Sequence, residues 1–152
     1  MSLKYRSATP EDAAECVAVR GRTRENAISA ERLGSVGITA QSWREDIRTG
    51  ALPGHVCVSE GRVVGYCFGA VKTGEVVVLA LLPDFENRGI GRELLSRVIS
   101  ELVSHGRSRL FLGCSPDPES RSYGFYRRLG WHATGNFDKY GDEILELNTG
   151  EQ

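Results

Sequence analysis

The sequence Glu86-Asn87-Arg88-Gly89-Ile90-Gly91-Arg92 joins a predicted strand to a predicted helix. An apolar run, Val76 to Leu82, precedes it, and the segment from Ile90 to Val103 has helical periodicity. Glycines let a backbone approach a ligand closely, and a helix start leaves several N–H groups unpaired at the positive end of the peptide dipoles. Because arginines flank those groups, we expect a phosphate or a pyrophosphate to bind here.

Two well-known phosphate motifs do not match this stretch. A P-loop needs a Gly-Lys-Ser/Thr ending, which does not follow Gly91, and a dinucleotide-binding turn needs a third glycine where this chain has Leu94. The plainer interpretation is a glycine turn that starts a helix and binds nothing. Other segments of the chain are needed to choose between this turn and a phosphate site.

The stretch resembles the acyl-CoA site of the GNAT family of N-acetyltransferases, which has the pattern Gln/Arg-x-x-Gly-x-Gly/Ala between a strand and a helix. This chain departs from the pattern at its first position, which is Glu86. A second segment, Phe125-Tyr126-Arg127-Arg128-Leu129-Gly130-Trp131, resembles the late Phe-Tyr-x-x-x-Gly-Phe/Trp segment of the family. Two motifs in the correct order are much more specific than either alone.

The composition is typical of a soluble globular protein. A chain of 152 residues fits one domain with a sizeable core, so we expect a single domain over residues 1–152. The net charge of -1 offers no broad basic surface for nucleic acid, and no apolar run is long enough to span a membrane. A strand pattern starts directly after Met1, so we expect no signal peptide and a cytoplasmic location.

Seven segments are predicted to be strands and four to be helices. The helical segments run from Thr9 towards Arg24, Thr39 to Gly50, Ile90 to Val103 and Ser120 to Leu129. The strand segments are Lys4–Ala8, His55–Ser59, Val63–Lys72, Glu75–Leu82, Arg109–Cys114, Trp131–Asn136 and Glu143–Leu147. Their order is that of the GNAT fold. The resemblance implies an α+β, three-layer fold with a mixed, mostly antiparallel sheet, splayed between its fourth and fifth strands.

Neither the cysteines nor the histidines indicate a metal or a disulfide. The four cysteines form no C-x-x-C pair, and three of them, Cys57, Cys67 and Cys114, lie in apolar strand segments. We therefore expect reduced core thiols. The three histidines are scattered without a spacing that suits a metal ion, so no metal cofactor is expected.

The resemblance implies acetyl-CoA as co-substrate. Its pyrophosphate would lie on the amides of Asn87, Arg88, Gly89, Ile90, Gly91 and Arg92, and its pantetheine arm would pair with the backbone of Leu79, Ala80 and Leu81. A bulge there would part this strand from Arg109–Cys114 and leave backbone groups for the pantetheine. An N–H near Leu81 would then polarise the thioester carbonyl.

Two side chains are candidates for proton transfer. Glu75 matches a glutamate at the start of the fourth strand in histone-type relatives and would take the proton of the amine; a water chain is the alternative base. On a regular strand Glu75 shares a face with Val77 and Leu79. These apolar neighbours would raise the pKa of Glu75. Tyr126 matches the tyrosine that protonates the CoA thiolate. The plainer interpretation of Glu75 is a solvated acid in a turn. That of Tyr126 is an aromatic side chain packed in the core.

These expectations describe an N-acetyltransferase that transfers an acetyl group from acetyl-CoA to a primary amine, of a small molecule or a protein N-terminus, directly in a ternary complex. Acceptor recognition is expected in Asn26–Trp43 and Phe137–Asp142, and a homodimer remains open. The alternative is a non-catalytic acyl-CoA sensor or partner-binding module, which the departures at Glu86 and Glu119 keep open. A thiol-based redox protein is a third interpretation.

Overall fold

The computed structural model describes residues 2–23 and 38–149, which form one seven-stranded sheet with the order β1-β2-β3-β4-β5-β7-β6. In the segment Asn26–Trp43, predicted to help recognise the acceptor, residues 26–37 lie outside these residues. The strands are β1 (Leu3–Ser7), β2 (Gly54–Ser59), β3 (Arg62–Ala70), β4 (Glu75–Leu81), β5 (Arg109–Cys114), β6 (His132–Phe137) and β7 (Glu143–Asn148). The helices are α1 (Ala13–Arg20), α3 (Ala40–Thr49), α4 (Ile90–Ser104) and α5 (Arg121–Arg128), with short 3-10 turns η1 (Pro10–Asp12) and η2 (Pro83–Phe85).

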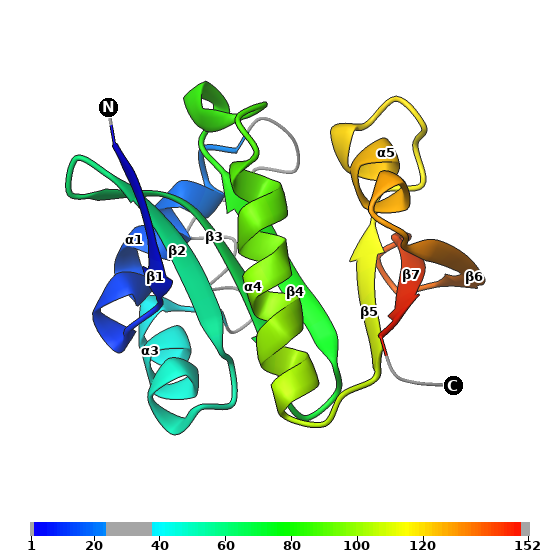
Figure 1. Cartoon of the computed structure of the whole chain (residues 1–152), viewed down its shortest axis with the longest axis horizontal. Coiled ribbons are helices and arrows are strands. Elements are labelled where there is room, and N and C mark those ends of the chain that lie inside the picture. Colours follow the sequence, from blue (N-terminus) through cyan, green and yellow to red (C-terminus); the bar gives the residue numbers. More distant parts are fainter. Residues whose placement is uncertain (1, 24–37, 150–152) are drawn as a thin grey trace.

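The helices form two outer layers around the sheet. Figure 1 shows α4 crossing in front of β3 and β4, with α1 and α3 behind the sheet. Neighbouring strands are antiparallel except β4 and β5, which are parallel. The predicted three-layer, mostly antiparallel sheet is confirmed.

Local signals placed the ends of α3 correctly, whereas the helix predicted from Thr9 towards Arg24 is divided into η1 and α1 and ends at Arg20. The side chain of Thr39 accepts a hydrogen bond from the backbone N–H of Ser42 at 3.0 Å, which caps α3. Gly50 ends the same helix with a φ of 84°, a conformation that a residue with a Cβ adopts only at a cost. These interactions involve residues close together in the chain, and sequence reasoning captures them well.

Apolar side chains fill both faces of the sheet. The buried side of α4 is the predicted one, and its four residues are at most 1% exposed: Ile90, Leu94, Val98 and Leu102. On the opposite face, Trp43 of α3 lies 5.6 Å from Tyr66 and 5.4 Å from Phe68, measured between ring centroids. The four cysteines, Cys16, Cys57, Cys67 and Cys114, are buried and free, as predicted.

Candidate active site

The strands β4 and β5 meet at one end and part at the other. In the described residues they are in register at a single position, where Glu75 stands opposite Phe111. From there β5 pairs with β7 along its whole length, while β4 keeps β3 as its partner. Figure 1 shows the two strands diverging towards the end where α5 lies. The predicted splay between the fourth and fifth strands is therefore present.

The free edge of β4 faces this gap. Leu79, Ala80 and Leu81 pair with β3 on one edge, and none of them is in register with β5 on the other. An unpaired strand edge offers N–H and C=O groups to an extended ligand. The three residues proposed to hold a pantetheine arm therefore line the gap with their backbone, while Ala80 itself is buried in the core.

A bulge in β4 lies earlier than expected and changes which way the side chains face. The register passes from Val78 to Val76 and leaves Val77 as the extra residue. As a result Val76 packs in the same core cluster as Leu79, on the face covered by α4.

Glu75 consequently faces the other side of the sheet from Leu79. It is paired with Ala70, which packs with the core under α1 and α3. The expectation that Glu75 shares a face with Val77 and Leu79 was wrong, because it assumed a regular alternation that the bulge at Val77 interrupts.

The turn before α4 has the backbone conformation of an anion site. Asn87 and Gly89 both have left-handed conformations, with φ values of 64° and 82°. A Cβ at Gly89 would meet nothing within 4 Å, so the backbone conformation and not space requires glycine. Gly89 is the N-cap, and the N–H groups of Ile90, Gly91 and Arg92 form the first turn of α4, where no helical partner exists. The six predicted residues thus lie together in one turn.

Arg121 of α5 reaches back to this turn. Its Nη1 lies 3.4 Å from Oε1 of Glu86, whose side chain is only 8% exposed, and its Nη2 donates to Oδ1 of Asn87 at 3.0 Å. Sequence reasoning missed Arg121, since it is 34 residues from Asn87 and carries no motif of its own.

Tyr126 of α5 is buried in the core on the face of the sheet that α4 covers. Its ring packs edge-to-face against Phe125 and Trp131, at centroid distances of 5.0 and 6.0 Å. Burial raises the pKa of Tyr126, and the nearby thiols Cys67 and Cys114 raise it further. The hydroxyl therefore keeps its proton at neutral pH and is available as a donor.

Glu75 belongs to a group of three carboxyl groups on the opposite face. Burial raises the pKa of Glu75, and the charge of Asp138 raises it further. The pKa of Asp142 is raised for the same two reasons. A Cβ at Gly113 of β5 would lie 3.0 Å from Oδ2 of Asp138 and 3.4 Å from Cβ of Asp142, so the small residue lets both aspartates lie against the strand. Sequence reasoning did not link these residues to Glu75.

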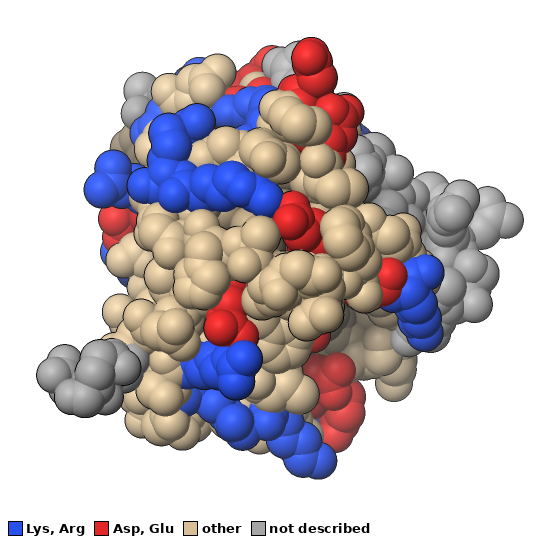
Figure 2. Space-filling model, turned by 90° about the vertical axis from the view of Figure 1, so that its right-hand side faces the viewer, with Lys and Arg blue, Asp and Glu red and all other residues tan. Residues whose placement is uncertain are grey.

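The face that carries β6 and β7 is mixed in charge. Figure 2 shows acidic side chains among uncharged ones in its middle, with basic side chains above and below them. Two large side chains are exposed here: Phe137 at the end of β6 is 58% accessible and Tyr140 in the β6–β7 connection is 74% accessible. The connection from Phe137 to Asp142, predicted to help select the acceptor, thus presents both aromatic and acidic groups.

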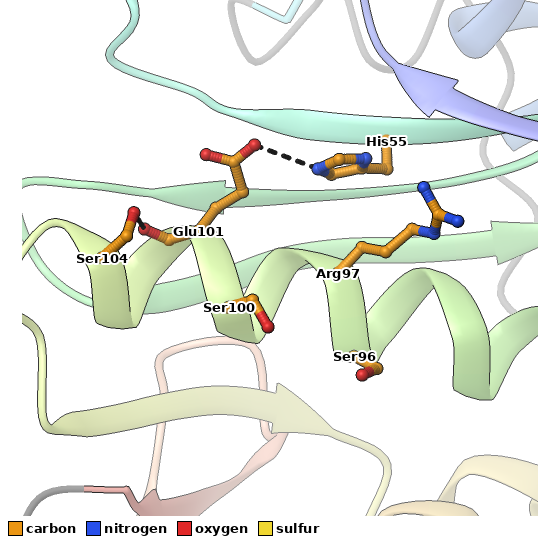
Figure 3. A pocket seen from close by; sticks show the side chains of 6 residues that line it. All are labelled: His55, Ser96, Arg97, Ser100, Glu101 and Ser104. Atoms are coloured by element: carbon orange, nitrogen blue, oxygen red, sulfur yellow. Dashed lines mark hydrogen bonds and ion pairs between the residues drawn. The ribbon is translucent and has the colours of Figure 1, made fainter.

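A separate polar hollow lies between α4 and β2, away from the gap. His55 and Glu101 meet there, with 3.1 Å between Nε2 and the carboxylate oxygen (Figure 3). The other lining residues are Ser96, Arg97, Ser100 and Ser104. Within residues 2–23 and 38–149, no group of three or more His, Cys, Asp or Glu side chains could hold a metal ion.

A sheet parted between its fourth and fifth strands, with a glycine turn at the head of the following helix, defines the GNAT class of fold. A model of the GNAT acetyltransferase family matches residues 25–131. The chain therefore belongs to the GNAT acetyltransferase family, and the resemblance noted in the sequence is confirmed. No helix in the described part of the chain is long and apolar enough to span a membrane.

A curated relative is an uncharacterized N-acetyltransferase of Chlorobaculum tepidum. It is 33% identical over 75 residues, which are 47% of this chain and 44% of the relative. The matched region therefore spans less than half of the length of that relative.

Solved structures share the fold over nearly the whole chain. The PaiA N-acetyltransferase of Thermoplasma acidophilum, in complex with coenzyme A, has a TM-score of 0.81 at 19% identity and covers 97% of this chain and 99% of its own. The YncA protein of Salmonella typhimurium, with its cofactor acetyl-CoA, has a TM-score of 0.75 at 20% identity, with coverages of 100% and 96%. The ribosomal-protein-S18-alanine N-acetyltransferase of Escherichia coli scores 0.72 at 17% identity, with coverages of 99% and 96%. At 17–20% identity these likenesses confirm the predicted fold, and the match to the acetyltransferase family agrees with the predicted use of acetyl-CoA.

Proposed function

We propose that this protein transfers an acetyl group from acetyl-CoA to a primary amine, directly and in a ternary complex. The observation that carries the proposal is the gap between β4 and β5. It begins beyond Glu75 and opens towards the end of β4, from which the chain leads through η2 to the anion-binding turn at residues 87–92. A cofactor held at that turn can lay its arm along the free edge of β4.

Binding of the cofactor follows from the backbone. The first-turn amides of α4 and the left-handed residues before them would hold the diphosphate by hydrogen bonds and by the helix dipole. The peptide-like pantetheine would pair with Leu79 to Leu81 as an added strand. A backbone N–H of β4 would then donate to the thioester oxygen as negative charge develops on it.

The acceptor is expected to enter from the opposite face. There the carboxylate of Glu75 takes a proton from the ammonium or from the attacking nitrogen, because a protonated amine has no lone pair to react. A raised pKa brings a carboxylate closer to the working pH of a base, which supports this role. The alternative base is a chain of water molecules in place of Glu75.

The leaving thiolate is protonated on the cofactor face of the sheet. The amine nitrogen bonds to the carbonyl carbon, the carbon–sulfur bond breaks, and the electron pair of that bond goes to sulfur. The hydroxyl of Tyr126 donates its hydrogen to the developing thiolate and regains a proton from solvent after the product leaves. No covalent acyl-enzyme is needed.

The carboxyl groups support an amine as the acceptor. Glu75, Asp138 and Asp142 place negative charge on the acceptor face, and a cationic amine would be attracted to it. The exposed aromatic rings of Phe137 and Tyr140 would add contact area for such a cation. A small amine and a protein N-terminus both have this chemistry.

A panel of primary amines with detection of free CoA thiol tests the function. Tyr126→Phe should lower kcat on an active amine by about 10²- to 10⁴-fold, the range of one general acid, while acetyl-CoA affinity is retained. Tyr123→Phe, on the same helix, is the control and should keep kcat near that of the wild type. Binding of acetyl-CoA without thiol release from any amine would instead support a non-catalytic acyl-CoA sensor.

A further inference from the structure

The turn proposed to hold the diphosphate contains a buried negative charge. Glu86 directly precedes Asn87 and is only 8% exposed at its side chain. A carboxylate next to an anion site repels the ligand, and low surrounding polarity strengthens that repulsion. The GNAT pattern has glutamine or arginine at this position, neither of which carries a negative charge. The chain therefore needs a compensating positive charge close by.

Arg121 supplies this charge from across the gap. Its guanidinium is 3.4 Å from Glu86 and donates a 3.0 Å hydrogen bond to the side chain of Asn87. Asn87 is one of two residues other than glycine that have a positive φ in the described residues, so its conformation is strained and benefits from a fixed partner. One arginine thus contacts both the charge and the strained residue.

A second contact connects the same two elements. A Cβ built at Gly91 would lie 3.6 Å from Cζ of Phe125, so the ring of Phe125 lies against the first turn of α4. The helix α5 therefore touches the turn through a polar contact at Arg121 and an apolar one at Phe125. The turn belongs to the β4 side of the gap and α5 to the β5 side, so these contacts join the two sides at the open end.

We propose that Arg121 is a positioning residue for the diphosphate: it offsets the charge of Glu86 and fixes Asn87, so that the turn accepts an anion despite the carboxylate. This inference rests on the proposed function, because the diphosphate is that of acyl-CoA. The pair of Glu86 and Arg121 then presents a neutral surface to the ligand, as an uncharged glutamine does elsewhere in the family.

A double-mutant cycle tests the proposal by calorimetry with coenzyme A and the full chain. Arg121→Ala should weaken binding by on the order of tenfold, because Glu86 then repels the diphosphate. Glu86→Gln alone should stay within about threefold of the wild type, and adding it to Arg121→Ala should restore most of the lost affinity. Steady-state kinetics should show the same pattern in KM for acetyl-CoA, with kcat little changed.

The cycle separates charge compensation from a merely structural role. If Arg121→Ala binds coenzyme A as the wild type does, or if Glu86→Gln fails to restore binding to it, the proposal is overturned. If the wild type itself does not bind coenzyme A, the result refutes the proposed function, on which the role of Arg121 depends. Should Arg121→Ala not fold, Arg121→Lys and Arg121→Gln replace it. Arg121→Lys keeps the charge that offsets Glu86 but cannot contact Glu86 and Asn87 together, so it should bind coenzyme A more weakly than the wild type and more tightly than Arg121→Gln. Arg121→Gln, which has no charge, should bind about tenfold more weakly than the wild type.

Discussion

Glu75 of β4 stands opposite Phe111 of β5, and in the described residues this is the one position at which the two parallel strands are in register. The pairing places Glu75 at the closed end of the gap, on the face away from α4. Tyr126 of α5 lies on the other face. The two candidate proton-transfer residues therefore approach the gap from opposite faces of the sheet, which suits a reaction between two substrates that arrive from opposite directions.

The pH dependence should report on Glu75 and its neighbour Asp138. If Glu75 is the base, it acts only when deprotonated, so kcat/KM rises with pH through its pKa, which burial and the charge of Asp138 raise. Asp138→Asn removes that charge while keeping an oxygen to accept from the backbone of Tyr140 and Asp142. The acidic limb of the profile should therefore move to lower pH.

The control for this shift is Asp46→Asn on α3, an exposed residue. It should leave the acidic limb where it is in the wild type. An unchanged limb in Asp138→Asn, in an otherwise folded and active variant, would mean that the base is not Glu75.

Replacement of Gly89 should weaken cofactor binding out of proportion to its effect on stability. Gly89→Ala forces a residue with a Cβ into a φ of 82°, with open space around it, so unfolding free energy should fall by about 1 kcal/mol. Gly50→Ala is a matched control, because Gly50 has a φ of 84° and also has open space, at the end of α3. Urea unfolding should show similar losses in both variants, but only Gly89→Ala should weaken the binding of coenzyme A measured by calorimetry.

The ion pair of Arg6 and Asp12 should contribute to stability in a pH-dependent way. Burial by itself would raise the pKa of Asp12, but hydrogen bonds from Arg6 and from the backbone N–H of Thr9 outweigh it and lower the pKa. A lowered carboxyl pKa contributes stability above the unfolded value, about 3.9, that is lost as pH falls through the folded value. Arg6→Met should therefore cost about 1 kcal/mol at pH 7, since Arg6 is 48% exposed, and less in acid.

Urea unfolding of Arg6→Met at neutral and acidic pH checks this expectation. Arg48→Met, which breaks the exposed pair of Arg48 with Glu45, should change stability little at either pH. Equal losses of unfolding free energy in both variants, or a loss in Arg6→Met that does not shrink in acid, would contradict the pH-dependent contribution expected of the Arg6–Asp12 pair.

The aromatic cluster under α3 should be the most sensitive part of the core on the α1 and α3 face. Trp43 is 7% exposed and contacts two rings of β3. Trp43→Ala removes that packing and leaves a cavity, so it should cost about 3–5 kcal/mol in unfolding free energy. Trp43→Phe keeps one ring and should lose less than half as much. A small loss in the alanine variant, measured by urea unfolding, would show that the cluster tolerates a cavity.

Much of the fold could be predicted because its signals are local. The buried side of α4 follows from apolar residues three and four positions apart, and the ends of α3 follow from Thr39 and Gly50. The strand Arg109–Cys114 has the bounds expected from its apolar run. The glycine turn at residues 87–92 was found in the same way, since its conformation depends on Asn87 and Gly89 themselves.

The bulge in β4 could not be read from the chain. Val76, Val77 and Val78 are three identical side chains, so a strand of either register looks the same in the sequence. Pairing with β3 decides the matter, because packing places Val76 against α4 and leaves Val77 42% exposed. That choice also decides which face Glu75 occupies.

The sequence by itself determined the family, the order of the elements and the turn that is proposed to bind a diphosphate, because each depends on residues close together in the chain. Only the tertiary structure decided the face of Glu75, its proximity to Asp138, and the contact of Arg121 with Glu86 and Asn87. Those relationships join residues far apart in the sequence. They arise from the packing of strands and helices, which no local pattern of residues encodes.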